Sequence, residues 1–249
     1  MNNEDEIKKY WDRETTESMY DKNLLDLEIS AIREQLHESD KIIDIGCGEG
    51  EGTVKYAEKV RELIALDFSP TRLKKLKARN SRITTVQMDM RKLAPQTLGN
   101  DFDKVITQRS LINLKNYEEQ KDLIKIIHSL LKKSGTYILL EGFLDGADNI
   151  NAVRRDFNLP PINVKWHNCF FQRTALLEFI QEYFALESRR EFSVYFFMTR
   201  VFNAVLKYPE IPQWNDPINN LAARMENKYK SAFLNGLSRL EMWVLKKKG

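Results

Sequence analysis

Three aspartates stand at or near the ends of three apolar runs in the first 89 residues: Asp44, Asp67 and Asp89. Asp44 is followed by a turn that carries glycine at every second position from 46 to 52. Glycine lets the backbone adopt positive φ and lets a ligand approach closely, and nucleotide-binding αβ units hold their ligand against the amides of such a turn. Asp67 lies 23 residues after Asp44, about where a ribose-binding carboxylate belongs in such a unit.

The elements that must position these residues alternate between strands and helices. Apolar runs predict strands near 41–45, 62–67, 83–89, 102–107 and 136–140, and a final antiparallel hairpin drawn from 186–198 and 237–245. Helical spacing predicts helices within 5–37, 116–131 and 174–183 and from Asp216 to about 233. We therefore expect an α/β, Rossmann-like, seven-stranded and mostly parallel sheet with helices on both faces and a helical lid.

The length suits one domain, residues 1–249, with segments added to a minimal core. We expect an N-terminal helical cap over 1–38, a ligand-binding core over 39–142, and lid insertions at 143–173 and 199–236. The first insertion leaves the last parallel strand at its carboxyl end, where open α/β sheets bind ligands. The second insertion is expected either to join the lid or to form a subunit contact.

Composition limits the function classes. No apolar run is long enough to cross a membrane, and the polar N-terminus does not resemble a signal peptide, so a cytoplasmic protein is expected. Cys47 and Cys169 are far apart, which argues against a disulfide framework or a zinc site, and we expect no metal. A net charge of +3 is too small to indicate nucleic acid, and the basic run 72–79 is predicted to be a solvated helix face.

The strand-and-acid pattern resembles the class I S-adenosylmethionine-dependent methyltransferases. That resemblance implies S-adenosyl-L-methionine as cofactor and a methionine-binding loop comprising Asp44, Gly46, Cys47, Gly48 and Gly50. It assigns Asp67 to the ribose hydroxyls, Asp89 to the adenine amino group and Met90 to the adenine ring, with Phe68 and Gln108 as further cofactor contacts. A dinucleotide dehydrogenase is the alternative for this half, but it normally requires G-x-G-x-x-G, whereas the glycines here alternate.

Methyl transfer to a hydroxyl benefits from a general base, whereas an ionised acceptor needs none. His167 is the candidate base because it lies in the presumed lid beside Trp166 and Asn168; packing on Trp166 is the alternative. Arg109 follows the fourth strand at the predicted catalytic edge, and Glu141 ends the fifth strand, so both are candidate catalytic residues. Their alternatives are a surface ion pair and a turn cap, respectively.

The candidate acceptor-binding residues are mostly cationic, because arginine forks fit phosphate and carboxylate groups. They are Arg109, Asn113, Arg154, Arg155, Arg173 and Tyr195. Tyr195 is included because the alternation through 192–198 predicts a strand with one face toward the pocket. The expected partner is a small-molecule acceptor, with anionic acceptors among the candidates, and the oligomeric state is left open, with a dimer as one option.

The segments 141–146, 149–151 and 166–168 resemble bacterial methyltransferases of surface-polysaccharide gene clusters. This resemblance implies O-methylation of a sugar, a nucleotide-linked sugar or a phosphate-type group. Two other classes stay open: a cofactor-binding regulatory or scaffold module without turnover, and an RNA methyltransferase. No Asn/Asp-Pro-Pro-Tyr or Pro-Cys follows the fourth strand, which argues against methylation of DNA-base amino groups and against a cytosine-C5 mechanism.

Overall fold

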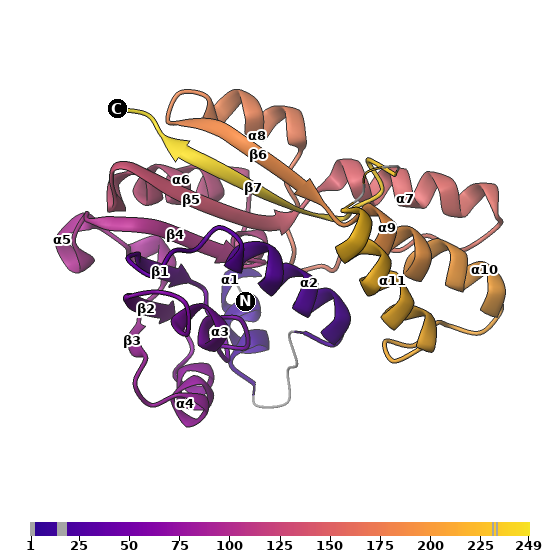
Figure 1. Cartoon of the computed structure of the whole chain (residues 1–249), viewed down its shortest axis with the longest axis horizontal. Helices are drawn as coiled ribbons and strands as arrows, with labels where there is room; N and C mark the ends of the chain where they lie inside the picture. The colour runs from indigo at the N-terminus through magenta and orange to yellow at the C-terminus, as the bar shows by residue number, and fades with distance from the viewer. Residues whose placement is uncertain (1–2, 14–18, 231, 233) are drawn as a thin grey trace.

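The computed structural model describes residues 3–13, 19–230, 232 and 234–249, so part of the predicted N-terminal cap, 14–18, lies outside the described residues. Its centre is a seven-stranded sheet in the order β3-β2-β1-β4-β5-β7-β6 (Figure 1). The strands are β1 (Lys41–Ile45), β2 (Glu62–Asp67), β3 (Thr84–Gln87), β4 (Phe102–Gln108), β5 (Leu131–Gly142), β6 (Phe184–Glu191) and β7 (Leu240–Lys247). The pairings among β1 to β5 are parallel, and β7 pairs antiparallel with both β5 and β6. The predicted fold class is confirmed.

Helices cover both faces of this sheet, because alternate strand residues point to opposite sides. One apolar cluster joins Ile42, Ile106 and Ile138 to α2 (Lys22–Arg33), α3 (Thr53–Ala57) and α4 (Pro70–Arg79). The other joins Ile43, Val105 and Leu139 to α6 (Tyr117–Leu130) and α8 (Arg173–Ile180). The remaining helices and helical turns are α1 (Asn3–Trp11), η1 (Met90–Lys92), α5 (Pro95–Leu98), η2 (Leu111–Asn113), α7 (Leu144–Asp156), α9 (Ser193–Phe196), η3 (Phe197–Phe202), α10 (Asn203–Lys207) and α11 (Pro217–Tyr229).

The strand predicted through 192–198 was wrong. β6 ends at Glu191, and the chain from Ser193 to Lys207 runs through α9, the π-helical η3 and α10 without an extended segment. The apparent alternation arose because Ser193, Val194, Tyr195 and Phe196 are all buried, so the aromatic residues pack around the whole helix rather than on one strand face. These helices gather with α7 and α11 at one end of the molecule (Figure 1).

Two features of the topology bring distant segments to one edge of the sheet. The parallel strands β1, β2, β4 and β5 all end there, and antiparallel β7 begins there, since Leu240 pairs with Gly142 at the end of β5. After α7, the loop 157–172 returns to the same edge, where the amide of Cys169 donates to the carbonyl of Ile112 over 2.6 Å. Within the described residues no helix is long and apolar enough to cross a membrane.

Candidate active site

A cavity of about 460 Å³ lies along the carboxyl edge of the sheet. One part of its wall comes from the loops after β1, β2 and β4, and it includes Asp44, Gly46, Asp67 and Gln108. The other part comes from the loop 157–172, from η3 and from the start of β7. The cavity is therefore built from two regions that are far apart in the sequence.

The glycine turn shapes the first part of the wall. Gly46 has φ of +76°, and a Cβ built there would lie 2.4 Å from the Cβ of Ser110, so a side chain would strain the backbone and push into the β4 loop. Gly46, Cys47 and Gly48 all line the cavity. Gly50 does not line it: its missing side chain makes room for Leu76 of α4, which places Gly50 in the packing of the turn against that helix.

Asp67 joins the glycine turn to the next loop. One carboxylate oxygen accepts the amide of Gly48 over 2.8 Å, and the other accepts the amide of Ser69 over 2.9 Å. Burial raises the pKa of Asp67, and these two amide hydrogen bonds oppose that rise. Each oxygen has a second lone pair, so the side chain can still accept hydrogen bonds from a diol such as a ribose. The position and bonding of Asp67 fit the role expected for it.

Asp44 is buried beneath the turn and lines the cavity. The hydroxyl of Thr53 donates to its carboxylate over 2.6 Å. Burial raises the pKa of Asp44 to about 7; the Thr53 hydrogen bond opposes this rise and the nearby charge of Asp67 adds to it. A carboxyl that is close to half protonated at neutral pH would gain from a positively charged ligand, because a cation favours its ionised form.

Asp89 lies apart from the main cavity. Together with Phe68, it lines a neighbouring hollow of about 350 Å³, while Phe68 and Met90 both line the main cavity. Its carboxylate is bound by Arg91 and by Lys8 of α1, the latter over 2.9 Å. Burial opposes ionisation of this carboxyl, but hydrogen bonds from Arg91 and Lys8 outweigh it and lower the pKa of Asp89. An adenine amino group bound there would share the carboxylate with these two cations.

Gln108 and Arg109 line the cavity at the end of β4 and are both held by Glu28 of α2. Gln108 donates to Glu28 over 2.7 Å and accepts the hydroxyl of Tyr56 over 2.7 Å. Arg109 has φ of +52° and forms an ion pair with Glu28, which is completely buried. The charge of Arg109 is thus balanced inside the protein, and no sequence pattern indicates Glu28 as its acidic partner.

Glu141 is completely buried and does not line the cavity. Its carboxylate accepts the backbone amides of Ser110, Leu111 and Ile112 at 3.0–3.3 Å and so caps the helical turn η2. Burial raises the pKa of Glu141 to about 7, although the three amides oppose that rise. The structure places Glu141 as the support of the loop after β4, so it caps a turn, but not the turn after its own strand that the alternative expected.

His167 lines the cavity and is only 3% exposed. Its ring packs against Tyr10 and Trp11 of α1 and against Trp166, with ring centres 4.6–5.3 Å apart. Burial and then the charge of Lys165 lower the pKa of His167 to about 4, so the imidazole is neutral near pH 7. Its Nδ1 is buried and has no hydrogen-bond partner in the described chain. A neutral imidazole with a free nitrogen can accept a hydrogen bond or a proton.

Helix α1 closes over this part of the cavity. The indole nitrogen of Trp11 donates to the side chain of Asn113 over 3.1 Å, and both residues line the cavity. The backbone carbonyl of Trp11 accepts from Arg72 over 2.7 Å. Arg72 is only 4% exposed, so the predicted solvated face of the basic run 72–79 was wrong at this position. The arginine points inward because α1 and the glycine turn both offer it partners.

Four of the predicted acceptor-binding residues lie outside the cavity wall. Arg154 is buried and donates to the carbonyls of Pro160 and Arg200. Arg173 donates to Glu241 over 2.5 Å. Arg155 is exposed on α7, and Tyr195 is completely buried with its hydroxyl donating to Asp21 over 2.6 Å. Arg154, Arg173 and Tyr195 therefore support loops and side chains around the cavity.

Other cationic residues line the cavity, where these arginines were expected. Lys165, Arg200 and Arg239 line the cavity, and none of the three was a candidate from the sequence. Arg200 pairs with Asp21 over 2.6 Å and packs over the ring of Trp214. No motif marks these residues; what could have indicated Arg239 is its position just before an antiparallel last strand. In the described ranges, no cluster of three or more His, Cys, Asp or Glu side chains is arranged to hold a metal ion.

Part of the chain matches a known family of protein domains. Residues 42–135 match the family profile described as "Methyltransferase domain". The carboxy-S-adenosyl-L-methionine synthase of Nautilia profundicola is 26% identical over 144 residues, which cover 54% of this chain and 58% of that protein. The chain thus spans little more than half the length of the curated relative that it matches.

Two solved structures share the fold at low sequence identity. The N-methyltransferase NodS of Bradyrhizobium japonicum, solved with S-adenosyl-L-homocysteine, has a TM-score of 0.56 and 12% identity, and the match covers all of both chains. Phosphoethanolamine N-methyltransferase 1 of Haemonchus contortus has a TM-score of 0.63 and 16% identity over 98% of this chain and 49% of that one. Residues 42–135 therefore match a methyltransferase domain, and the chain has the class I S-adenosylmethionine-dependent methyltransferase fold.

Proposed function

We propose that this chain is an S-adenosylmethionine-dependent methyltransferase that methylates an oxygen atom of a small polar acceptor. The observation that carries the proposal is the single cavity in which Asp67, the glycine turn and Met90 face the same space as His167. The first set suits a nucleoside-linked cationic cofactor, and the second provides a proton acceptor beside it. The domain match and the structural neighbours solved with the demethylated cofactor support this reading.

The chemistry is a displacement: the acceptor oxygen forms a bond to the methyl carbon, the bond from that carbon to the cofactor sulfur breaks, and the hydroxyl proton leaves. The protein aligns the cofactor with the acceptor and excludes water. Together these effects can lower the activation barrier by about 7–11 kcal/mol. Helix α1 contributes to both, because Trp11 donates a hydrogen bond to Asn113 and packs edge to face against His167.

His167 is proposed to receive the proton of the acceptor hydroxyl on its unpartnered Nδ1. With a pKa of about 4 in the free protein it is a weak base, because burial and the charge of Lys165 oppose its protonation. A negatively charged group on the acceptor would offset the charge of Lys165 and raise the pKa of His167. Proton transfer would then be favoured after the acceptor has bound.

Sugars, nucleotide-linked sugars and phosphate-type groups of surface-polysaccharide assembly are the acceptor classes that we propose. The cavity is suited to such molecules because its wall carries Arg109, Lys165, Arg200 and Arg239 next to amides such as Asn113 and Asn168. Amide and guanidinium groups bind hydroxyls and oxyanions, and aromatic residues of the same wall, among them Trp11, Phe170 and Trp214, can pack against the rest of the acceptor.

The test has two stages. Calorimetry first measures binding of S-adenosylmethionine and of S-adenosylhomocysteine, and we expect both to bind at one site per chain. A turnover assay then screens nucleotide-sugars, sugar phosphates and phenols for formation of the demethylated cofactor. Turnover confined to phenols would contradict the polar-acceptor proposal, while absence of cofactor binding by folded protein would contradict the methyltransferase proposal itself. Cofactor binding without turnover of any acceptor would favour a regulatory role.

A further inference from the structure

Arg239 reaches the cavity because of the way the sheet ends. It precedes β7, which runs antiparallel to β5 and begins where β5 stops, and the carbonyl of Arg239 accepts the amide of Phe143 over 2.9 Å. The residue is therefore fixed by its backbone at the carboxyl edge of the sheet. From there its side chain contributes to the cavity wall next to Leu240.

The guanidinium of Arg239 has few partners. It lies over the ring of Phe170, 5.5 Å from the ring centre, and among the described residues its single hydrogen bond is a long one of 3.4 Å to the carbonyl of Asn163. Its Nε is buried and has no hydrogen-bond partner in the chain as described. Within the described ranges, no carboxylate lies within ion-pair distance of this guanidinium.

The other arginines of the cavity wall differ in this respect. Arg109 pairs with Glu28, Arg200 pairs with Asp21, and Arg72 lies 3.5 Å from Glu49. Lys165 is more like Arg239: it lines the cavity, its ammonium lies 5.5 Å from the ring centre of Tyr20, and no described carboxylate pairs with it. Two cations in one wall thus lack an acidic partner among the residues that the structure describes.

A buried cation without a counter-ion is costly, because the protein must desolvate it without providing a compensating charge. Arg239 is half-buried with its Nε enclosed, and burial and then the charge of Arg200 lower its pKa to about 10. At neutral pH the group nevertheless remains protonated. A ligand oxyanion would provide the missing acceptor for Nε and the missing negative charge together, and the planar fork of arginine suits phosphate and carboxylate oxygens.

We propose that Arg239, assisted by Lys165, binds an oxyanion of the acceptor molecule, either a phosphate-type group or a carboxylate, in the part of the cavity formed by the C-terminal segments. This assignment rests on the proposed function, since it gives the acceptor of that reaction its charge and its orientation. It differs from the expectation based on Arg154, Arg155 and Arg173, which lie outside the cavity wall.

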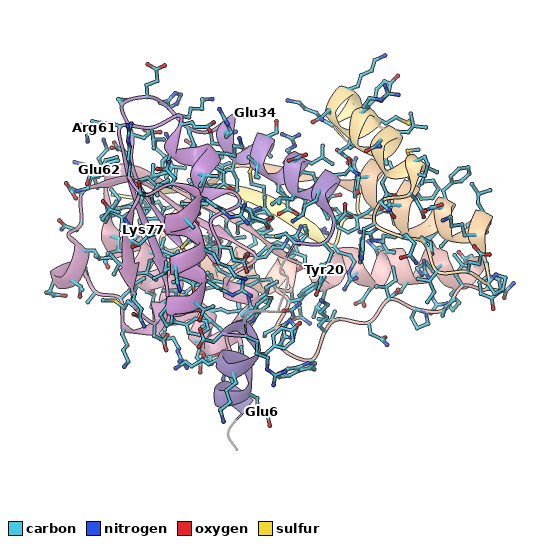
Figure 2. The ribbon with its side chains drawn as sticks, turned by 90° about the horizontal axis from the view of Figure 1, so that it is seen from below. Glu6, Tyr20, Glu34, Arg61, Glu62 and Lys77 are labelled. Carbon is cyan, nitrogen blue, oxygen red and sulfur yellow. The ribbon has the colours of Figure 1, made fainter. Side chains whose placement is uncertain are left out.

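The experiment measures anion binding to the full chain with and without saturating S-adenosylhomocysteine. The probes are inorganic phosphate, methylphosphonate and acetate, followed by calorimetry or by phosphorus and carbon NMR line shifts. The variants are Arg239→Gln, Arg239→Lys and the control Arg61→Gln. Arg61 is exposed and precedes β2 at the opposite edge of the sheet, and Figure 2 shows it far from Tyr20 of the cavity wall.

We expect Arg239→Gln to weaken binding of the preferred anion by about tenfold or more, and Arg239→Lys to give an intermediate loss, because lysine keeps the charge without the fork. Arg61→Gln should bind as the parent does. Tighter binding of phosphate or methylphosphonate would identify a phosphate-type acceptor, and tighter binding of acetate a carboxylate.

Equal anion affinity in the parent and in Arg239→Gln, or no binding of any of the three probes at tens of millimolar, would overturn the proposal. Binding of S-adenosylhomocysteine serves as the check on folding and should change less than twofold in every variant. Because the anion is also titrated without this cofactor product, a chain that fails to bind it still provides a test of Arg239, and the two proposals can fail separately.

Discussion

The two parts of the cavity wall are built in different ways. In the N-terminal part, the polar groups lie at or near the ends of strands, and Asp67 is held by amides of the neighbouring loops at Gly48 and Ser69. In the C-terminal part, side chains from the loop 157–172, from η3 and from the start of β7 meet across long stretches of sequence. The first part is a local motif, and the second exists only once the whole sheet has formed.

Their charges differ as well. The N-terminal part carries the acids Asp44 and Asp67, and its arginines, Arg72 and Arg109, are paired with glutamates. In the C-terminal part, Lys165 and Arg239 have no acidic partner among the described residues. Such a division suits a reaction in which a cationic donor meets an electron-rich acceptor, because each partner finds opposite charge on its own side. Variants that act on one part and not on the other are therefore the sharpest tests of this division.

The largest effect is expected for Asp67→Ala. The substitution leaves the amides of Gly48 and Ser69 without an acceptor and removes the proposed ribose contact, and charge-assisted hydrogen bonds contribute about 1.5–3 kcal/mol each. We expect affinity for S-adenosylhomocysteine, measured by calorimetry, to fall about 100-fold. Asp67→Asn should fall less, since it retains one acceptor oxygen. Anion binding at Arg239 should survive in both variants; its loss would show that the two parts are not independent.

The next effect belongs to His167→Phe, which keeps an aromatic ring against Tyr10 and Trp11 but removes the free nitrogen. If His167 accepts the proton, kcat should fall about 100-fold while cofactor affinity stays within twofold. Trp166→Phe is the control for packing, because it alters a ring against His167 but leaves Nδ1 of the histidine in place. An unchanged kcat in His167→Phe would assign the histidine to packing alone.

The difference between the two parts of the cavity wall also explains which features could be predicted from the sequence. The order of strands and helices through β5, the glycine turn and the positions of Asp44 and Asp67 could be predicted because apolar periodicity and local spacing determine them. Glu141 was placed correctly at the end of a strand, but its role as a cap of η2 depends on three amides about 30 residues away. Spacing along the chain does not encode such contacts.

The residues of the C-terminal part of the cavity wall were not predicted, and the reason is physical. A fully buried helix and a fully buried strand both appear as apolar runs, and α9 with η3 was assigned to the wrong class for that reason. Once that segment was misplaced, Tyr195 was expected to face the pocket, and Arg200 was overlooked. Arg154 and Arg173 were recognised as cations near the lid, but the sequence could not reveal that backbone carbonyls and Glu241 already bind them.

A smaller effect is expected from pH. Because the pKa of Asp44 is raised to about 7, the free protein holds a proton there that a cationic ligand would displace. Affinity for S-adenosylmethionine should therefore rise as pH rises, by about tenfold between pH 6 and 8, and Asp44→Asn should abolish this dependence.

The stability of the unliganded protein should change with pH in the opposite direction. A raised carboxyl pKa stabilises the fold at low pH, and that contribution is lost as pH rises from about 4 through about 7. Calorimetric titrations across this range test the first statement, and thermal melts test the second.

The smallest effect is expected for Arg155→Ala. Arg155 lies exposed near the end of α7, next to Arg154, which is buried and whose guanidinium donates to the carbonyls of Pro160 and Arg200. A solvated guanidinium contributes little to stability or binding, so the acceptor KM and the cofactor affinity should both stay within twofold. Arg154→Ala should instead lower the melting temperature, because the two carbonyls would lose their donor. A severalfold rise in KM for Arg155→Ala would mean that α7 moves onto the acceptor during the reaction. The cationic part of the cavity wall would then include α7 as well as the loop 157–172, η3 and the start of β7.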